Sequence, residues 1–251
     1  MPSDTDWKAW ENRKERVVQS IRENDFDFFG LQECSTDIQT YLADELDDTY
    51  NIRFFSPYSQ DGNGNKAQGL AYKKAWTLTD WHYFWLSDTP GTMCQNDSDA
   101  NGNYNRGGCC GVLSKDDKHI FVMVTHGALN SDVRAEYAHV YEDMERLYNT
   151  SGYPCIFVGD MNAQPSDASS VAYRTYWTDT YDGVGSAGRL GPYSTFNGFN
   201  LSRNMYSDPH RIDYIYYRGA ITPLNYVCNG TKYDDYYASD HLPVYSNMRL
   251  E

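Results

Sequence analysis

Residues 237–244, Tyr237-Ala238-Ser239-Asp240-His241-Leu242-Pro243-Val244, place an acid and an imidazole directly before an apolar run. The Leu-Pro-Val run predicts the start of a strand, so the Asp-His pair would lie at the mouth of that strand. Asp is a hard oxygen ligand for a divalent cation, and His exchanges a proton near neutral pH. In isolation such a pair is more often a loop cap beside a surface histidine, so its meaning depends on the rest of the chain.

Other apolar, strand-like runs also end in acid, amide or imidazole groups. These groups are Glu33, His126, Asp160 with Asn162, and Asp213. Each residue alone could be a helix cap or a buried histidine with satisfied hydrogen bonds. Because strand ends of one sheet converge on one rim, we expect the five groups to meet there with Asp240 and His241. The recurrence of the pattern favours a functional site over separate caps.

The hydrophobic pattern predicts a mixture of helices and strands in one domain over residues 1–251. Residues 4–6 are expected to cap a first helix, and Thr36 with Gln39 forms a capping-box pattern for a second. The predicted helices cover 7–24, a segment from residue 36, and 132–149. The predicted strands cover 27–33, 50–55, 69–73, 78–84, 120–125, 155–159, 211–217 and 242–248. A long loop rich in Asp, Asn and Gly is expected over 86–108.

Composition excludes several classes of protein. The chain has 251 residues and a net charge of −14, which argues against a protein that holds nucleic acid mainly by neutralising phosphates. The charge does not exclude an enzyme that meets phosphates through a metal ion, because the cation supplies the local positive charge. No apolar run approaches the roughly 20 residues that a membrane-spanning helix needs, and the amino-terminal residues do not resemble a signal peptide.

The six cysteines show neither a CxxC pair nor a spacing suited to zinc. Cys155 and Cys228 lie in apolar contexts and are predicted to be buried thiols. Cys94, Cys109 and Cys110 belong to one region, so a single disulfide among them is an open alternative in an oxidising compartment.

Taken together, these segments resemble the endonuclease/exonuclease/phosphatase superfamily, the group that includes DNase I. The motifs that carry the resemblance are Gly30-Leu31-Gln32-Glu33, Thr125-His126, Gly159-Asp160-Met161-Asn162, Arg211-Ile212-Asp213-Tyr214-Ile215 and Ser239-Asp240-His241-Leu242-Pro243-Val244. Residues 84–90, Phe84-Trp85-Leu86-Ser87-Asp88-Thr89-Pro90, are similar to a bacterial subgroup of undefined substrate. The resemblance implies an α+β fold: a four-layer α/β sandwich of two packed, mainly antiparallel sheets flanked by helices.

The resemblance also implies a role for each polar strand end. Glu33 would bind Mg²⁺ or Mn²⁺, with Asp240 near the metal. His241 would be the general base, and Asp213 would hold its tautomer. Asp160 would orient the attacking water. Asn162, His126 and Arg134 would contact the substrate. Apart from the resemblance, Trp85 and Tyr237 lie near the presumed rim and are candidates for stacking on a base or sugar; the alternative, more common for such residues, is that they pack loops together.

The chain departs from the family pattern at its beginning. The family fold opens with a strand before the first helix, whereas residues 1–6 are too short and polar to form it, so we expect that strand to be absent. Residues 127–130 after His126 also differ from many relatives, although Arg134 fits the bacterial subgroup.

The sequence therefore predicts a metal-dependent phosphoester hydrolase, a phosphodiesterase or a phosphatase. Its substrate would be a small molecule, a lipid headgroup or nucleic acid, and acidic charge favours the smaller phosphoesters. The alternatives are a DNase-like nuclease and a catalytically silent binding module on the same fold. We expect a monomer, and the resemblance favours an extracytoplasmic location.

Overall fold

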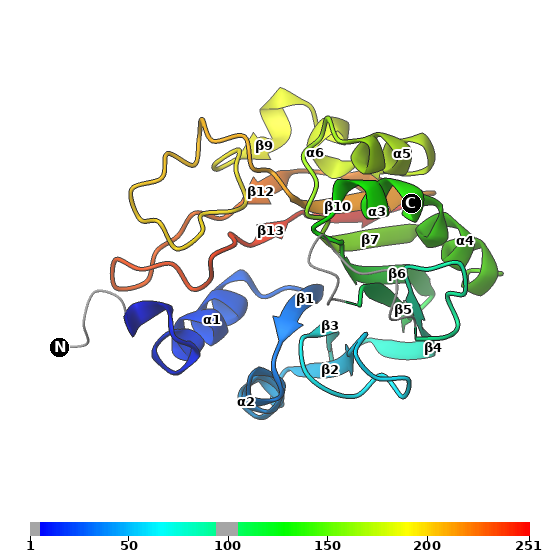
Figure 1. The fold of residues 1–251 in the computed structure, drawn as a ribbon, viewed down its shortest axis with the longest axis horizontal. Helices are drawn as coiled ribbons and strands as arrows, with labels where there is room; N and C mark the ends of the chain where they lie inside the picture. The colour runs from blue at the N-terminus through cyan, green and yellow to red at the C-terminus, as the bar shows by residue number, and fades with distance from the viewer. Residues whose placement is uncertain (1–5, 94–104) are drawn as a thin grey trace.

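Two β-sheet layers lie face to face between layers of helices in the computed structural model, which describes residues 6–93 and 105–251 (Figure 1). The larger sheet has the strand order β4-β5-β6-β7-β10-β8. Its strands are β4 (Thr77–Trp85), β5 (Gly107–Lys115), β6 (Lys118–His126), β7 (Cys155–Asp160), β8 (Thr178–Asp179) and β10 (Asp213–Arg218). Most neighbours are antiparallel, and β6 and β7 run parallel.

Strand β6 shows how this sheet separates two cores. Its residues Phe121 and Met123 pack with aromatic side chains of the helices on one face. Its residues Ile120, Val122 and Val124 pack with the second sheet layer on the other face. The helices of the first face are α3 (Ser131–Glu136), α4 (Ala138–Tyr148) and α5 (Ala168–Tyr176). A strand buried on both faces reads as a continuous apolar run, which is why 120–125 lacks polar alternation.

The second sheet layer consists of separate pieces that cover the same face of the larger sheet. One piece has the order β1-β3-β2, and another pairs β11 with β14. The strands are β1 (Phe28–Cys34), β2 (Tyr50–Phe55), β3 (Ala67–Lys73), β11 (Ile221–Pro223) and β14 (Met248–Leu250). Gly30 permits the close approach of the layers, because a Cβ there would lie 2.8 Å from Cγ2 of Val158.

Helices α1 (Trp10–Asn24) and α2 (Thr36–Leu46) form the fourth layer. Their buried residues, such as Ile21 and Leu42, pack with Phe29 and Leu31 on the outer face of β1. The remaining elements are η1 (Asp6–Lys8), α6 (Thr180–Gly183), η2 (Ser186–Gly188), β9 (Arg189–Leu190), β12 (Tyr226–Cys228) and β13 (Val244–Tyr245). The four-layer sandwich predicted from the sequence is confirmed.

Several predicted element ends are corrected by local hydrogen bonding. Helix α1 begins after Ala9, which makes no side-chain cap hydrogen bond, and Asp6 belongs to η1; residues 4 and 5 of the predicted cap lie outside the described residues. Ser35 caps α2 by accepting a hydrogen bond from the backbone N–H of Ile38, so the cap precedes the predicted Thr36 by one residue. The predicted helix over 132–149 is divided at Tyr137, and the predicted strand over 242–248 is divided into β13 and β14. Strand β5 starts inside the predicted long loop.

The described residues bear on the predictions for the cysteines and for a membrane-spanning helix. Cys155 and Cys228 are buried free thiols, as predicted. Cys109 and Cys110 are also free and buried, whereas Cys94 lies outside the described residues. No helix in the described part of the chain is long and apolar enough to cross a bilayer.

One buried ion pair fixes the loop before β10. Nη2 of Arg211 donates to Oδ2 of Asp179 at 2.8 Å, and both side chains are nearly inaccessible, with exposures of 2% and 0%. Asp179→Asn keeps a capping oxygen for α6 but leaves the Arg211 charge uncompensated. We expect a loss of about 3–5 kcal/mol in the free energy of unfolding, measured by urea denaturation. The exposed pair of Arg22 with Asp48 gives the control Asp48→Asn, for which about 0–1 kcal/mol is expected. Equal losses in the two variants would contradict the prediction.

Candidate active site

Strand register brings three of the predicted residues into one row. Asp160 pairs with His126 across β6 and β7, and with Asp213 across β7 and β10. All three are at least nine-tenths buried. The row lies at one end of the larger sheet, because His126 and Asp160 are the last residues of their strands and Asp213 is the first of its own. The predicted convergence of these strand ends is therefore present.

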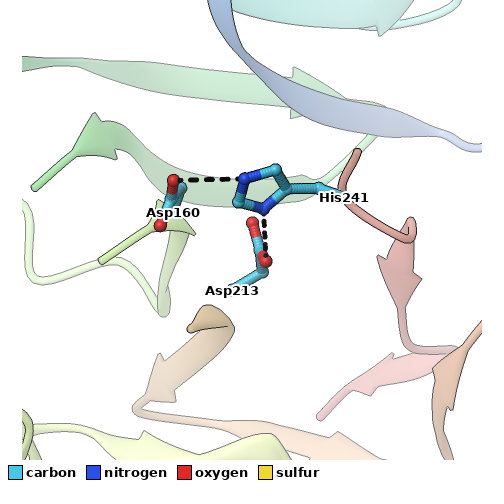
Figure 2. Close-up of side chains that lie close together, drawn as sticks. All are labelled: Asp160, Asp213 and His241. Carbon is cyan, nitrogen blue, oxygen red and sulfur yellow. Dashed lines mark hydrogen bonds and ion pairs between the residues drawn. The ribbon is translucent and has the colours of Figure 1, made fainter. Parts of the chain in front are cut away.

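His241 reaches this row from the loop before β13. Its Nδ1 lies 2.9 Å from Oδ2 of Asp213, and its Nε2 lies 3.8 Å from Oδ2 of Asp160 (Figure 2). The backbone of 195–198 holds the loop: Leu242 N–H donates to the carbonyl of Thr195 at 2.6 Å, and Asn197 N–H donates to that of Asp240 at 2.8 Å. A segment far away in sequence thus fixes the position of the imidazole.

Asp160 is surrounded by imidazole and amide groups. Its Oδ2 lies 3.4 Å from Nε2 of His126, and its Oδ1 accepts from the backbone N–H of Asn162 at 2.8 Å. Burial raises the pKa of Asp160 to about 7, and the nearby charge of Asp213 adds to that effect. Asp160 therefore exchanges a proton within the neutral range rather than in the usual range of a carboxyl.

The charge state of His241 is set by competing effects. Burial disfavours the imidazolium, but the Asp213 charge and hydrogen bond, with the charges of Asp160 and Asp240, outweigh burial and raise the pKa of His241 to about 10. Without a cation the side chain is therefore protonated at neutral pH. A neutral proton acceptor requires that some of this carboxylate charge be compensated.

This shift predicts how stability depends on pH in the metal-free protein. The pKa of His241 is higher in the folded protein than the value of 6.5 that it has in the unfolded chain, so protonation of its ring stabilises the fold. This stabilisation is fully present below pH 6.5 and is lost as pH rises through about 10. We expect the stability advantage of the wild type over His241→Gln, measured by urea unfolding in EDTA, to shrink between pH 6.5 and 10. An advantage that grows with pH over this range would contradict the assignment.

A second imidazole has its tautomer fixed by an arginine. Nη1 of Arg106 lies 2.8 Å from Nδ1 of His126. Because a guanidinium can only donate, Nδ1 must accept, and the proton of the neutral ring lies on Nε2. Burial and the charge of Arg106 hold the pKa of His126 well below its usual range. His126 is thus a neutral donor whose Nε2–H points toward Asp160 and Glu33, 3.4 Å and 3.9 Å away.

The predicted metal ligands line the same hollow as this cluster. Glu33 is the residue before the last of β1; it has a left-handed backbone with φ of +59°, and its side chain is 71% exposed. Asp240 lies beside His241 and accepts from the hydroxyl of Ser239 at 3.2 Å. Both carboxylates open into a pocket of about 610 Å³. Such hard oxygen donors fit Mg²⁺ or Mn²⁺. Ligand atoms of Asp160, Asp213 and His241 also lie within 4.8 Å of one another.

The predicted substrate contacts divide into pocket residues and core residues. Asn162, His126 and Arg134 line the pocket. Arg134 also donates to the carbonyls of Ala128 and Leu129.

Trp85 and Tyr237 do not fit the predicted stacking role and require correction. Trp85 is 1% exposed and its Nε1–H donates to the carbonyl of Pro57. Tyr237 is 6% exposed and packs with Leu242. Both rings pack in the hydrophobic core, as large aromatic side chains commonly do.

Three residues in or behind the pocket were missed by sequence reasoning. Arg106 falls within the predicted long loop, and Thr195 and Phe196 lie in a segment without hydrophobic periodicity. Phe196 forms a pocket wall, with its ring centroid 5.0 Å from that of His241. Each acts through a contact between distant segments, so no local sequence signal identifies it.

Thr195 positions the carboxylate behind His241. Its hydroxyl donates to Oδ2 of Asp213 at 2.6 Å and accepts from the backbone N–H groups of Ile212 and Asp213. Thr195→Val removes these bonds at almost constant volume. A hydrogen bond to a charged group contributes about 1.5–3 kcal/mol. Because this bond holds the carboxylate that orients His241, we expect kcat of the predicted phosphoester hydrolysis to fall by about tenfold or more. Thr180→Val, at another fully buried threonine outside the pocket, should leave kcat unchanged. Wild-type kcat in Thr195→Val would contradict the role.

Comparisons with known proteins bear on the family and the fold of this chain. The profile of the Endonuclease/Exonuclease/phosphatase family matches residues 6–241. A conserved protein of unknown function from Enterococcus faecalis V583 is similar in structure, with 21% identity, a TM-score of 0.85 and coverage of 99% of this chain and 94% of that one. The mannosyl-6-phosphatase Bt3783 of Bacteroides thetaiotaomicron has 22% identity, a TM-score of 0.83 and coverage of 98% and 95%.

A human structure is more distant. The catalytic domain of human Nocturnin has 17% identity and a TM-score of 0.71, and the match covers 97% of this chain and 88% of that one. At these identities the structural likeness shows the fold alone. No curated protein sequence matches this chain.

Proposed function

The chain belongs to the endonuclease/exonuclease/phosphatase family, and on this premise we propose that it is a phosphoester hydrolase dependent on Mg²⁺ or Mn²⁺. The observation that carries the proposal is the Asp213–His241 pair, whose imidazole lines a pocket together with the carboxylates of Glu33 and Asp240 and the neutral donors of His126 and Asn162. Phosphoester hydrolysis needs a base in line with the leaving oxygen and donors for charge that develops on the phosphoryl oxygens.

His241 is the proposed base. Because Asp213 holds Nδ1, Nε2 is the nitrogen that faces the pocket and takes a proton from the attacking water. Asp160, whose Oδ2 lies 3.8 Å from Nε2, would orient that water by accepting a hydrogen bond from it. A proton placed on His241 is stabilised by the same carboxylates that raise its pKa.

Neutral donors surround the place proposed for the phosphoryl group. The Nε2–H of His126 has its tautomer fixed by Arg106, so it is available to a phosphoryl oxygen. Asn162 uses its side-chain N–H₂ once, toward the carbonyl of Gly127 at 3.0 Å, and its second N–H can donate to substrate. Donors fixed before the reaction stabilise developing charge without reorganisation.

Glu33 and Asp240 would hold the divalent cation. When bound, the cation supplies positive charge that polarises the phosphoryl group and offsets the carboxylate charge around His241. Both side chains open into the pocket, and their oxygen donors suit Mg²⁺ and Mn²⁺ better than softer metals.

The proposed substrate is a small phosphoester. The pocket of about 610 Å³ has the size of a small-molecule site, and the net charge of −14 disfavours long polyanions. One structural relative is named a mannosyl-6-phosphatase, which is consistent with a sugar phosphate. Another, D. rerio TDP2, was solved with a single-strand DNA product, so a nucleic-acid substrate remains the alternative to be tested.

A substrate panel tests the proposal. Sugar phosphates, small phosphodiesters, lipid phosphodiesters and DNA would be assayed with Mg²⁺, with Mn²⁺ and with EDTA, beside a His241→Ala variant. We expect metal-dependent release from the small phosphoesters that EDTA and the variant both abolish. Faster turnover of DNA would replace the substrate assignment, and equal activity in EDTA would contradict the mechanism. Absence of turnover together with absence of Mn²⁺ binding in calorimetry would favour a silent binding module.

A further inference from the structure

The catalytic pocket contains a second histidine–aspartate pair that the proposed chemistry does not use. His210 lines the same pocket of about 610 Å³ as His126 and His241. Its Nδ1 lies 2.7 Å from Oδ1 of Asp208, in the loop that precedes β10. Its side chain is 44% exposed, so part of the ring is accessible to a ligand in the pocket.

Backbone and side-chain hydrogen bonds hold His210 in place. Its carbonyl accepts from the backbone N–H groups of Thr195 and Phe196 at 3.0 Å and 3.3 Å. Its own N–H donates to Oδ1 of Asp208 at 3.0 Å, and the same oxygen accepts from the hydroxyl of Ser194 at 3.1 Å. Because Thr195 also holds the carboxylate behind the catalytic imidazole, one segment fixes both histidines. A side chain fixed before binding loses little entropy when it contacts a ligand.

The hydrogen bond to Asp208 decides what His210 can bind. Burial disfavours the Asp208 carboxylate, but hydrogen bonds from His210 and Ser194 outweigh burial and lower the pKa of Asp208. A carboxylate can only accept, so Nδ1 of His210 carries the proton, and Nε2 of the neutral ring is an acceptor. Within the described part of the chain, Nε2 of His210 has no hydrogen-bond partner. The pocket therefore presents an unused acceptor at this position.

His126 and His210 have opposite polarity toward the pocket. Nδ1 of His126 accepts from Arg106, so its Nε2 carries the proton and can donate. A phosphoryl oxygen is an acceptor, so it matches the donor of His126 and would be repelled by the Nε2 lone pair of His210. A hydroxyl group can donate and matches His210. The two histidines thus suit different parts of a phosphoester, the phosphoryl group and the alcohol.

The surroundings of His210 favour a neutral hydroxyl over an ammonium group. Nε of Arg203 lies 3.7 Å from Oδ2 of Asp208, and its Cζ lies 5.3 Å from the centroid of the Phe196 ring. This cation repels a positively charged ligand at the same wall. The Phe196 ring also contacts His210, with a centroid distance of 6.5 Å, and lines the pocket. An apolar ring beside a fixed acceptor suits an alcohol that has a carbon skeleton and hydroxyl groups.

We propose that His210 is a specificity-determining residue whose Nε2 accepts a hydrogen bond from a hydroxyl of the alcohol part of the substrate. The inference rests on the proposed phosphoesterase function and narrows its substrate class to phosphoesters of polyols or sugars. Phe196 packs against the carbon skeleton of the same alcohol. His210 takes no part in bond cleavage, so its contact is the same in the ground state and in the transition state. The contact therefore lowers KM and leaves kcat little changed.

A matched pair of esters tests this role. Mannose 6-phosphate and cyclohexylmethyl phosphate share ring size and phosphate attachment, and only the first carries hydroxyl groups. The ratio of their kcat/KM values with Mn²⁺ is compared between the wild type and variants. We expect His210→Phe and His210→Ala to lower the preference for mannose 6-phosphate by about tenfold, mainly through its KM, because one hydrogen bond is lost. His210→Gln keeps an acceptor and should retain the preference. His139→Phe, at an exposed histidine, should leave the ratio unchanged.

Calorimetry separates this inference from the proposed function. Both esters are titrated with Mn²⁺ into His241→Ala and into the double variant with His210→Phe, so that cleavage does not contribute. A selective loss of mannose 6-phosphate affinity in the double variant would support the role of His210, whether or not the wild type hydrolyses either ester. Hydrolysis by the wild type with an unchanged ratio in His210→Phe and His210→Ala would overturn this role and leave the phosphoesterase proposal intact.

Two further outcomes would overturn the role of His210. Equal losses of affinity for the two esters in the variants would show that the side chain supports the fold and does not recognise a hydroxyl. Failure of the wild type to bind mannose 6-phosphate at all would exclude a hydroxyl-bearing sugar ester from the pocket.

Discussion

His241→Ala is expected to lower kcat of phosphoester hydrolysis by about 10²–10⁴-fold, the usual contribution of a general base. The reason is geometric: Asp213 holds Nδ1 at 2.9 Å and leaves Nε2 facing the pocket. Removing the ring leaves water without a proton acceptor at that position. KM should change far less than kcat, because the ring is assigned to the chemical step. Steady-state kinetics with a small phosphoester and Mn²⁺ measures both constants.

Controls separate this loss from a general effect of removing an imidazole. His139→Ala removes an exposed histidine that also lies near a carboxylate, with its Nε2 3.9 Å from Asp143, and should keep wild-type kcat. Asp213→Asn should lose activity with His241 in place, and the double variant should be no slower than His241→Ala alone, because the two residues act as a unit. A kcat of His241→Ala within about threefold of the wild-type kcat would remove His241 from the mechanism, because so small a loss corresponds to less than about 1.4 kcal/mol.

The sequence predicted those residues of the site that lie at the ends of strands. His126, Asp160 and Asp213 each end or begin an apolar run, and the sheet register places them in one row. The sequence could not identify Thr195 or Arg106, because their roles depend on single hydrogen bonds between distant segments. It also misplaced Trp85, since an aromatic residue at a strand end is equally suited to a core and to a rim.

Fold prediction failed where tertiary contacts overrode local pattern. The apolar stripe of 132–149 continues through Tyr137, yet the backbone there leaves helical geometry and divides α3 from α4. Ser35, not Thr36, caps α2, and the Gln39 side chain donates to the carbonyls of Cys34 and Gly64 instead of closing the capping box.

Glu33→Gln is expected to weaken Mn²⁺ binding and to abolish metal-dependent hydrolysis. Residues that merely support metal ligands change affinity by about 10–100-fold, so loss of a direct carboxylate ligand should cost at least that much. Isothermal calorimetry measures the affinity. Glu45→Gln removes the same charge from an exposed position on α2 and is the matched control. An unchanged Mn²⁺ affinity in Glu33→Gln would contradict the assignment.

The backbone of Glu33 offers an independent test of its function. A φ of +59° is costly for a side chain with a Cβ, by roughly 1–2 kcal/mol, and such conformations persist where function requires them. Glu33→Gly relieves that cost, so it should leave the free energy of unfolding unchanged or raise it, while hydrolysis is lost. A residue placed only for structure would show the opposite result, retained activity with reduced stability. Stability by urea denaturation and kcat on the same samples therefore separate a ligand-holding role from a structural one.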